Sequence, residues 1–326
     1  MNVQDEPLVS VVTPFFNTEE YLAECIESVL AQTYQNWEYI LVNNCSTDRS
    51  AEIAHHYAAK DERVVFVNND QFLTQVQNYN HALHQINPES KYCKMVQADD
   101  MILPECISRM VAVAEENPSV GIVSAYRIWG NKVRNVGLRY PDTIYEGKDV
   151  CRNQIIYGGH YIGTPTSILI RSEIVRSKEN FYREDIYFED TMVCYEILKS
   201  WNLGFVHQVE TMSRKDNDSI SSKLFNYDPD WLLSIFLTID EFGKHYLEKE
   251  EFNKKYKQIE EKYLKYLARN LLNRRDKEFW NYHETGTAMV GYELKKLKLF
   301  KYLVMELTKT MLNPVKDIKK IAFGKF

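Results

Sequence analysis

Apolar runs of strand length alternate with helical patterns through the first half of this sequence. The runs predict five β-strands, at residues 8–13, 37–42, 63–67, 92–97 and 120–125. Apolar residues at helical spacing follow each of the first four runs, and Pro104 begins the last of these predicted helices. This β-α-β order predicts an α/β fold with a mostly parallel sheet and helices on both of its faces.

Polar residues gather where the predicted strands end. Residues 14–17, 43–48, 68–71 and 99–100 follow the first four strands and are rich in polar side chains. In open α/β sheets, ligands bind beyond the carboxyl ends of the strands. We therefore expect a ligand site built from these four segments.

The second half of the chain has a different pattern. Residues 129–222 mix short apolar runs with Gly and Pro, which predicts a smaller, substrate-side half after a first half at 8–128. From 223 to 326 the pattern is helical and includes Lys/Glu-rich stretches. We predict one α/β domain over 8–222 and a C-terminal helical region.

The composition is that of a globular protein and argues against several functional classes. The 326 residues are 44% hydrophobic and 26% charged, and the net charge of −6 argues against a dedicated nucleic-acid binder. The six cysteines show no C-x-x-C spacing, so we expect reduced thiols of a cytoplasmic protein rather than a zinc site. The N-terminus has no signal-peptide pattern, and the longest apolar run, 231–239, is too short to span a bilayer.

Two carboxylates, Asp99 and Asp100, directly follow the fourth predicted strand. Carboxylate oxygens at this position suit Mn²⁺ or Mg²⁺, which binds the phosphates of a nucleotide diphosphate. The alternative is an acidic pair that caps the helix beginning at Pro104, and the motif alone does not separate the two.

The polar turn at 43–48 precedes a predicted helix. The N-terminus of a helix can receive a phosphate or a nucleotide, because its backbone N–H groups are unpaired. N-capping by Ser46 or Thr47 explains the same residues without any ligand.

A series of motifs, in order along the chain, resembles the family-2 glycosyltransferases of GT-A fold. VSVVTPFFN, SVLAQTY and VNNCSTD are similar to the family patterns V-S-V-I-I-P-x-Y-N, S-V-L-x-Q-T-Y and V-D-D-G-S-T-D. QNYNHAL and YCKMVQADDMILP resemble segments of one bacterial subgroup, and GTPTSILIRSEIV and FYREDIYFEDTMVCYEIL resemble acceptor-side and acidic motifs. The resemblance covers about residues 8–222 and implies a Rossmann-like nucleotide-binding sheet.

The resemblance also implies roles for the acidic residues. Asp100 is the implied metal ligand, and Asp99 lies near the ribose and the metal. Asp190 matches the general base that takes the proton of the acceptor hydroxyl, with Glu189 as its neighbour. From the residues alone, the dipole of a helix that begins here would explain Glu189 and Asp190.

A further set of residues is implied to bind the nucleotide sugar. Thr13 and Phe15 match positions that flank the base, and Asn44 matches a position that accepts a hydrogen bond from the uracil ring. The full implied set is Thr13, Pro14, Phe15, Asn17, Asn43, Asn44, Asp48, Gln77 and Asp99. The resemblance favours a UDP-sugar. Because Asn43-Asn44 replaces the usual Asp-Asp and an amide adds a donor, thymidine and guanosine diphosphate donors stay open.

The C-terminal tail carries a charge opposite to that of the rest of the chain. Residues 295–326 hold nine lysines and two acids, a net of 9 − 2 = +7, which leaves −6 − 7 = −13 elsewhere. Its apolar residues recur at helical spacing in one stripe, formed by Leu297, Phe300, Val304, Leu307 and Met311. This stripe predicts either a helix packed on its own domain or peripheral contact with the inner face of an anionic membrane.

Together, these features predict an inverting, metal-dependent glycosyltransferase that acts in bacterial surface-polysaccharide synthesis. Its expected partners are a nucleotide-diphosphate sugar and a saccharide or lipid-linked acceptor. A sugar-1-phosphate nucleotidyltransferase would need a Gly-rich loop after the first strand, where this chain has residues 14–17. A nucleotide-sugar-binding module without catalysis is the other alternative, suggested by the two asparagines at 43–44 and by Gln97.

Overall fold

The computed structural model describes residues 6–214 and 224–312. The chain divides into two compact units. The first comprises Met1–Glu184 with Phe188–Asn217, and the second comprises Asp185–Tyr187 with Asp218–Phe326. The domain boundary predicted at 222–223 lies outside the described residues.

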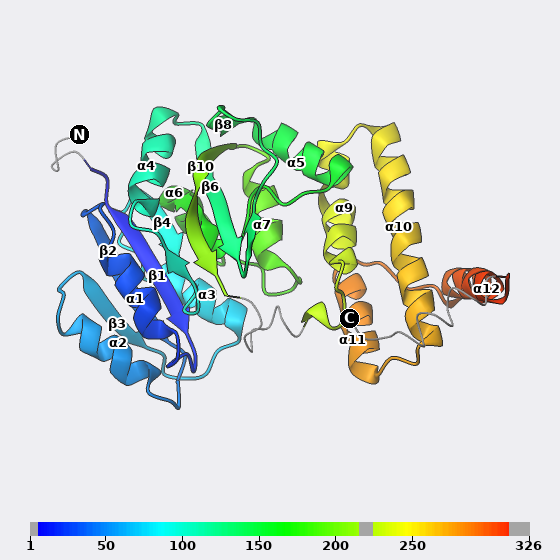
Figure 1. Cartoon of the computed structure of the whole chain (residues 1–326), viewed down its shortest axis with the longest axis horizontal. Coiled ribbons are helices and arrows are strands. Elements are labelled where there is room, and N and C mark those ends of the chain that lie inside the picture. Colours follow the sequence, from blue (N-terminus) through cyan, green and yellow to red (C-terminus); the bar gives the residue numbers. More distant parts are fainter. Residues whose placement is uncertain (1–5, 215–223, 313–326) are drawn as a thin grey trace. The chain divides into compact units, whose positions relative to one another are not determined.

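The first unit is built on one mixed sheet with the strand order β3-β2-β1-β4-β9-β6-β10-β5 (Figure 1). Two short strands extend it, because β7 pairs with β6 and β8 pairs with β10. The strands are β1 (Val9–Phe15), β2 (Trp37–Asn43), β3 (Val64–Asn68), β4 (Tyr92–Met95), β5 (Met101–Ile102), β6 (Val120–Trp129), β7 (Lys132–Arg134), β8 (Ile144–Tyr145), β9 (Ile168–Arg171) and β10 (Asn202–Ser213).

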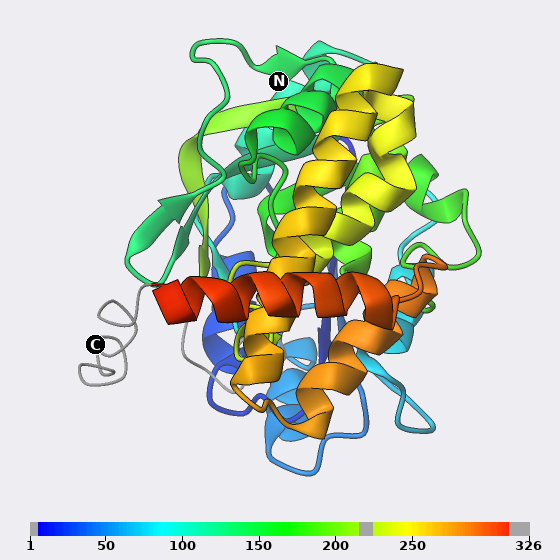
Figure 2. The same cartoon turned by 90° about the vertical axis from the view of Figure 1, so that its right-hand side faces the viewer.

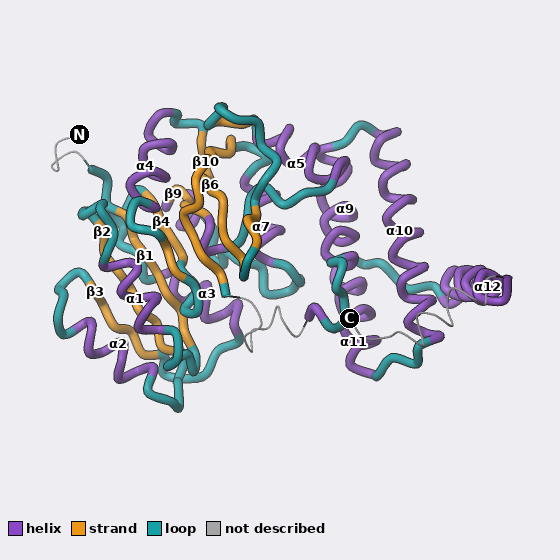
Figure 3. The backbone as a smooth tube through the Cα atoms, in the orientation of Figure 1, coloured by secondary structure: helices purple, strands orange, loops and turns teal. Residues whose placement is uncertain are grey.

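Helices cover this sheet on both faces (Figure 3). They are α1 (Leu22–Leu30), α2 (Ser50–Ala58), α3 (Gln75–His84), α4 (Cys106–Glu116), α5 (Gly147–Tyr157), α6 (Ser172–Arg176) and α7 (Glu189–Ile197), with a 3-10 turn η2 at Pro165–Ser167. All seven side chains of β1 are buried. Since successive side chains of a strand point to opposite faces, this burial requires packing on both sides of the sheet.

The predicted α/β fold is confirmed, and the sheet is more mixed than the sequence suggested. β1 pairs in parallel with β2 and β4, and β2 pairs in parallel with β3. β9, which the sequence pattern did not predict, lies between β4 and β6 and is antiparallel to both. β9 follows a Gly- and Pro-containing stretch in which the sequence shows no regular pattern, so its long-range pairing defines it.

A fully buried lysine connects β4 to the segment that precedes β9. The Lys94 side chain has no exposed surface. Its Nζ donates hydrogen bonds to the carbonyl oxygens of Thr166 (2.7 Å) and Ile168 (3.3 Å). Thr166 in turn accepts a hydrogen bond at Oγ1 from the backbone N–H of Gln97 (3.1 Å). These contacts fix η2 against the carboxyl end of β4.

Replacing Lys94 with Met should therefore destabilise the protein. Two buried carbonyl groups lose their donor, and we expect the free energy of unfolding to fall by about 3 kcal/mol in urea titrations. The matched control is Lys91→Met, because Lys91 is half exposed and pairs with Glu115 at the surface. That change should cost at most about 1 kcal/mol. Equal effects of the two substitutions would contradict this role of Lys94.

The second unit is helical. Its helices are α9 (Leu232–Tyr246), α10 (Lys249–Leu272), α11 (Lys277–Met289) and α12 (Lys296–Leu312). The buried carboxylate of Asp228 accepts hydrogen bonds from the N–H groups of Leu232 (2.8 Å) and Leu233 (2.7 Å), which caps α9. α10 packs against α9 and α12, and α12 lies across it (Figure 2). Among the described residues, every helix is too short or too polar to cross a bilayer.

Candidate active site

The loops that follow β1 and β2 are joined through Asn17. Its backbone N–H donates to Ser46 Oγ (3.0 Å), and its Oδ1 accepts from the Thr47 N–H (2.8 Å). Asn17 has a left-handed φ of 49°, which Asn tolerates better than most residues. Two of the segments expected to form the ligand site are therefore in direct contact.

Asparagine side chains connect the end of β2 to the loop after β3. Asn43 Nδ2 donates to Asn68 Oδ1 (2.6 Å). Asn44 Nδ2 donates to the carbonyl of Leu73 (2.8 Å), while its Oδ1 accepts from the Leu73 N–H (2.9 Å) and from Asn69 Nδ2 (3.0 Å). An amide oxygen has two lone pairs, and both are used here. The expected hydrogen bond from uracil to Asn44 is therefore revised: Asn44 holds the loop that follows β3.

Thr13 also differs from expectation. Its side chain is fully buried, and its hydroxyl contacts Tyr39 Oη and the carbonyl of Val96, both at 2.8 Å. Pro14 is buried in the same strand, and the Phe15 side chain is 2% exposed. The side chains of these three residues pack in the core, so they support the strand end rather than flank a base.

Asp48 and Gln77 stabilise helix N-termini at the same edge of the sheet. Asp48 accepts hydrogen bonds from the N–H groups of Ser50 and Glu19, both at 3.0 Å. Partial burial acts to raise the pKa of Asp48, but these hydrogen bonds outweigh it and hold the pKa below its usual value. Gln77 forms a capping box with Thr74 and donates from Nε2 to Glu184 (3.0 Å).

The Asp99-Asp100 pair lies in the turn after β4. The Asp100 side chain is 4% exposed, and its Oδ2 accepts a hydrogen bond from Ser213 Oγ (3.2 Å) at the end of β10. Burial, and then the charge of Asp99, raise the pKa of Asp100 to about 7, while Thr166, Arg127 and Ser213 oppose the shift. The site therefore concentrates negative charge that a cation would neutralise.

Arg127, on β6, is a site residue that sequence reasoning missed. Its positive charge lowers the pKa of both Asp100 and Asp190, so it contributes to the electrostatic environment of the two carboxylates. Its Nη1 lies 3.4 Å from Ser213 Oγ, and its Nε is buried without a hydrogen-bond partner among the described residues. The predicted strand ended at residue 125, whereas β6 continues to Trp129, so nothing local marked Arg127 as part of the site.

Glu189 and Asp190 form the first turn of α7, after Phe188 in a left-handed conformation (φ 62°). The Thr191 N–H donates to Asp190 Oδ1 (2.7 Å). Burial raises the pKa of Asp190, and burial followed by the Asp190 charge raises the pKa of Glu189 to about 7. Carboxyl groups with raised pKa values near a partly buried arginine, here Arg127, are typical of acid–base sites.

The residues present fit a divalent cation held partly by its substrate. Among the described residues, no three His, Cys, Asp or Glu side chains form a cluster that could hold a metal alone. Mn²⁺ and Mg²⁺ need fewer protein ligands, since one or two carboxylates with phosphate oxygens and water complete their shell. Asp99 and Asp100 could supply those carboxylates.

An exposed aromatic pair lies at the same edge of the sheet. Phe16 (41% exposed) and Phe72 (61% exposed) meet edge to face, with ring centroids 4.9 Å apart. Phe16 follows β1 and Phe72 lies in the loop after β3, which Asn44 holds. Exposed aromatic faces at the carboxyl ends of parallel strands offer an apolar surface for a planar ligand.

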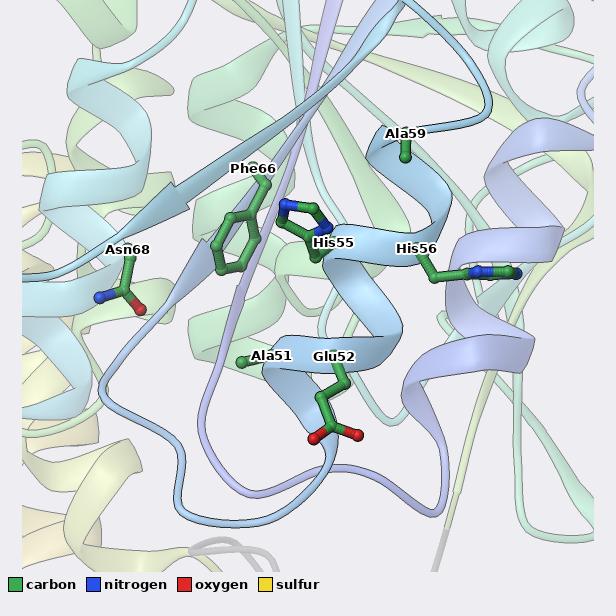
Figure 4. Close-up of a pocket in the computed structure, with 7 residues that line it drawn as sticks. All are labelled: Ala51, Glu52, His55, His56, Ala59, Phe66 and Asn68. Atoms are coloured by element: carbon green, nitrogen blue, oxygen red, sulfur yellow. The ribbon is translucent and has the colours of Figure 1, made fainter.

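A shallow hollow lies between α2 and β3 (Figure 4). It is lined by Ala51, Glu52, His55, His56, Ala59, Phe66 and Asn68. This lining contains no residue of the site predicted from the sequence. The hollow is connected to that site through Asn68, whose side chain accepts a hydrogen bond from Asn43. The hollow therefore lies beside the predicted site rather than within it.

Comparison with known proteins identifies the family. The sequence model described as Glycosyl transferase family 2 matches residues 10–177, about half of the chain. The chain belongs to glycosyltransferase family 2. The predicted family membership is thereby confirmed.

Relatives of this family-2 chain are found in bacteria and archaea. An uncharacterized glycosyltransferase of Methanocaldococcus jannaschii is 28% identical over 174 residues, which are 53% of this chain and 58% of that protein. The putative glycosyltransferase EpsE of Bacillus subtilis is 25% identical over 237 residues, covering 71% of this chain and 81% of EpsE. The chain thus spans little more than half the length of some of its relatives.

Solved structures show the same fold. TarS of S. aureus in complex with UDP-GlcNAc aligns with a TM-score of 0.58 at 16% identity, covering 90% of this chain and 79% of that one. The mannosyltransferase PcManGT from Pyrobaculum calidifontis, in complex with GDP-Man and Mn²⁺, aligns with a TM-score of 0.56 at 14% identity, covering 95% and 88%. At such identities the likeness establishes the fold alone.

Because Glu189 has a raised pKa, it should weaken the fold as the pH rises. The unfolded carboxyl titrates near 4.5 and the folded one near 7, so the folded state binds more protons between these values and loses stability as the pH increases. We expect Glu189→Gln to be about 3 kcal/mol more stable than the parent at pH 8, with a smaller difference at pH 5. Urea unfolding at the two pH values, without metal or nucleotide, measures this.

Glu196→Gln is the matched control on the same helix, because Glu196 is exposed and pairs with Lys199. It should produce no pH-dependent gain in stability. A gain of equal size in the control, or none in Glu189→Gln, would show that burial at the start of α7 does not penalise the charge.

Proposed function

We propose that the protein is an inverting, metal-dependent glycosyltransferase that moves a sugar from a UDP-sugar to a saccharide or lipid-linked acceptor. We place its work at the cytoplasmic side of the membrane, in the synthesis of bacterial surface polysaccharide. Support for a UDP donor comes from TarS, whose structures contain UDP and UDP-GlcNAc, while PcManGT contains GDP-Man. The similarity to TuaG of Bacillus subtilis, a putative teichuronic acid biosynthesis glycosyltransferase, supports the surface-polysaccharide role.

The observation that carries the proposal is the position of Arg127. Its guanidinium influences the pKa of Asp100, after β4, and of Asp190, at the start of α7. The implied metal ligand and the implied base, which lie 90 positions apart in the sequence, therefore share one electrostatic environment. Sugar transfer needs this proximity, because the acceptor must lose its proton while the diphosphate departs.

Asp190 would act as the base. Its carboxylate accepts the proton of the acceptor hydroxyl, and that oxygen forms a bond to the anomeric carbon. The bond from this carbon to the diphosphate oxygen breaks on the opposite face, so the configuration inverts and the nucleoside diphosphate leaves. A raised pKa makes a carboxylate a stronger base at neutral pH.

The other charged site residues would neutralise the charge of the diphosphate and of the neighbouring carboxylates. Asp99 and Asp100 would hold Mn²⁺ or Mg²⁺, which supplies charge neutralisation to the diphosphate. Arg127 offers a buried, unpaired N–H to an anion and offsets the carboxylates that surround it. Gln77 and the exposed Phe16–Phe72 pair would line the part of the site that holds the nucleotide sugar.

Replacing Asp190 with Asn tests the base. Asn keeps the size of the side chain and can hydrogen-bond to the Thr191 N–H, but it cannot take a proton. We expect turnover to fall by about a hundredfold or more, with donor affinity nearly unchanged. Turnover with acceptor and donor affinity by calorimetry measure the two effects separately.

Two outcomes would contradict this assignment. Near-normal turnover in Asp190→Asn would move the base to Glu189 or to another group. A collapse of donor affinity would instead place Asp190 among the donor-binding residues. If the parent protein itself shows neither transfer nor donor hydrolysis while binding UDP, the chain is a binding module rather than an enzyme.

Replacing Asp100 with Asn tests the metal site. We expect Mn²⁺ to tighten UDP binding to the parent, and this tightening to be lost in Asp100→Asn, because the amide has no negative charge to offer the cation. The matched control is Asp149→Asn, since Asp149 is an exposed carboxylate on α5. Calorimetry with and without Mn²⁺ measures the difference. Unchanged Mn²⁺ dependence in Asp100→Asn would contradict the metal assignment.

A further inference from the structure

One face of α12 exposes large apolar side chains to solvent. Leu297 is 86% exposed, Phe300 62%, Val304 43% and Leu307 41%. Their spacing of three and four residues places them on the same side of the helix. We call these four residues the apolar stripe of α12.

The opposite side attaches α12 to α10 through polar contacts. Arg269 Nε donates to Glu306 Oε2 (2.8 Å), and Lys298 Nζ donates to Glu260 Oε1 (2.7 Å). Glu306 is 7% exposed, so it belongs to the covered side of the helix. The sequence left open whether the apolar stripe packs on its own domain. Within the described residues it does not, because polar and half-buried groups occupy that contact instead.

The charge around the apolar stripe indicates what covers it. Lys301, on α12, and Lys295, just before the helix begins, are both exposed. Residues 295–326 carry a net charge of +7, whereas the rest of the chain carries −13. A second copy docking its own stripe here would bring two positive tails together, which costs electrostatic energy. An anionic lipid surface would complement both the lysines and the apolar residues.

We propose that α12 lies flat on an anionic membrane surface, with its apolar stripe in the boundary between headgroups and acyl chains. The helix holds four lysines and one glutamate in 17 residues, which suits the interface and not a span. Lys295 and Lys301 contact the headgroups. This docking is independent of the proposed sugar transfer, because it uses only residues of the second unit.

Vesicle co-sedimentation of the full chain tests the proposal. The vesicles are phosphatidylcholine alone, or an equimolar mixture of phosphatidylcholine and phosphatidylglycerol, each at low and high salt. We expect binding to the mixed vesicles that weakens as salt screens the lysines. Leu297→Asn with Phe300→Asn should reduce this binding at least about tenfold, since both side chains lose their apolar burial.

Three further variants sharpen the result. Leu271→Asn with Leu272→Asn, which changes two exposed leucines of α10, should leave binding unchanged. Phe300→Leu keeps an apolar side chain and should retain binding. Lys295→Glu with Lys301→Glu should weaken binding mainly at low salt. Because all of these side chains are exposed, the variants should keep the parent's urea midpoint, which confirms that they fold.

Two results would overturn the proposal. If the full chain ignores the mixed vesicles at low salt, or binds them equally well with Asn at 297 and 300, the stripe is not a lipid contact. If sedimentation velocity instead shows a dimer that the Asn variant abolishes, the stripe binds a second copy of the chain. Neither result affects the proposed transfer reaction, which is measured with soluble acceptor.

Discussion

The ammonium group of Lys94 is enclosed by protein and donates to the carbonyls of Thr166 and Ile168. An ammonium ion is buried only where its hydrogen bonds are satisfied, so β4 cannot move independently of η2 and β9. Thr166 then bonds the backbone at Gln97 and helps to hold Asp100. The geometry of the acidic pair thus depends on a contact between segments more than 70 residues apart in the sequence.

The site built on this frame is electrostatically costly. Asp100, Glu189 and Asp190 all have pKa values raised by burial, and the charge of Arg127 opposes this shift at Asp100 and Asp190 only in part. Buried like charges destabilise the protein alone, but they are the arrangement that a cation and an anionic substrate can relieve together. The burial of these carboxyl groups therefore both destabilises the protein and prepares the site to bind a cation and accept a proton.

The helical unit is stabilised by different interactions. Its core is aromatic, with Tyr263 bonded to His283 Nδ1 (2.9 Å) and Phe236 stacked on Tyr263. Ion pairs of Glu306 with Arg269 and of Lys298 with Glu260 help to hold α12 against α10. This leaves apolar surface free on the part of the chain that carries most of the positive charge.

The sequence by itself determined the elements with strong local patterns. The strands β1–β4 and β6 were predicted because each contains a run of apolar residues long enough to be buried. The pairs Asp99-Asp100 and Glu189-Asp190 were found because their chemistry is visible in adjacent residues. The helical C-terminal region followed from apolar spacing alone.

Only the tertiary structure decided how these parts meet. β9 lies between β4 and β6. The charge of Arg127 acts on both Asp100 and Asp190. The side-chain amide of Asn44 forms hydrogen bonds to the backbone of Leu73 rather than remaining open to a base. The side that α12 presents to α10 was likewise open in the sequence, because a stripe of apolar residues specifies a helix face but not its partner. Each of these features is a contact between distant segments, and local sequence patterns encode only the conformation of neighbouring residues.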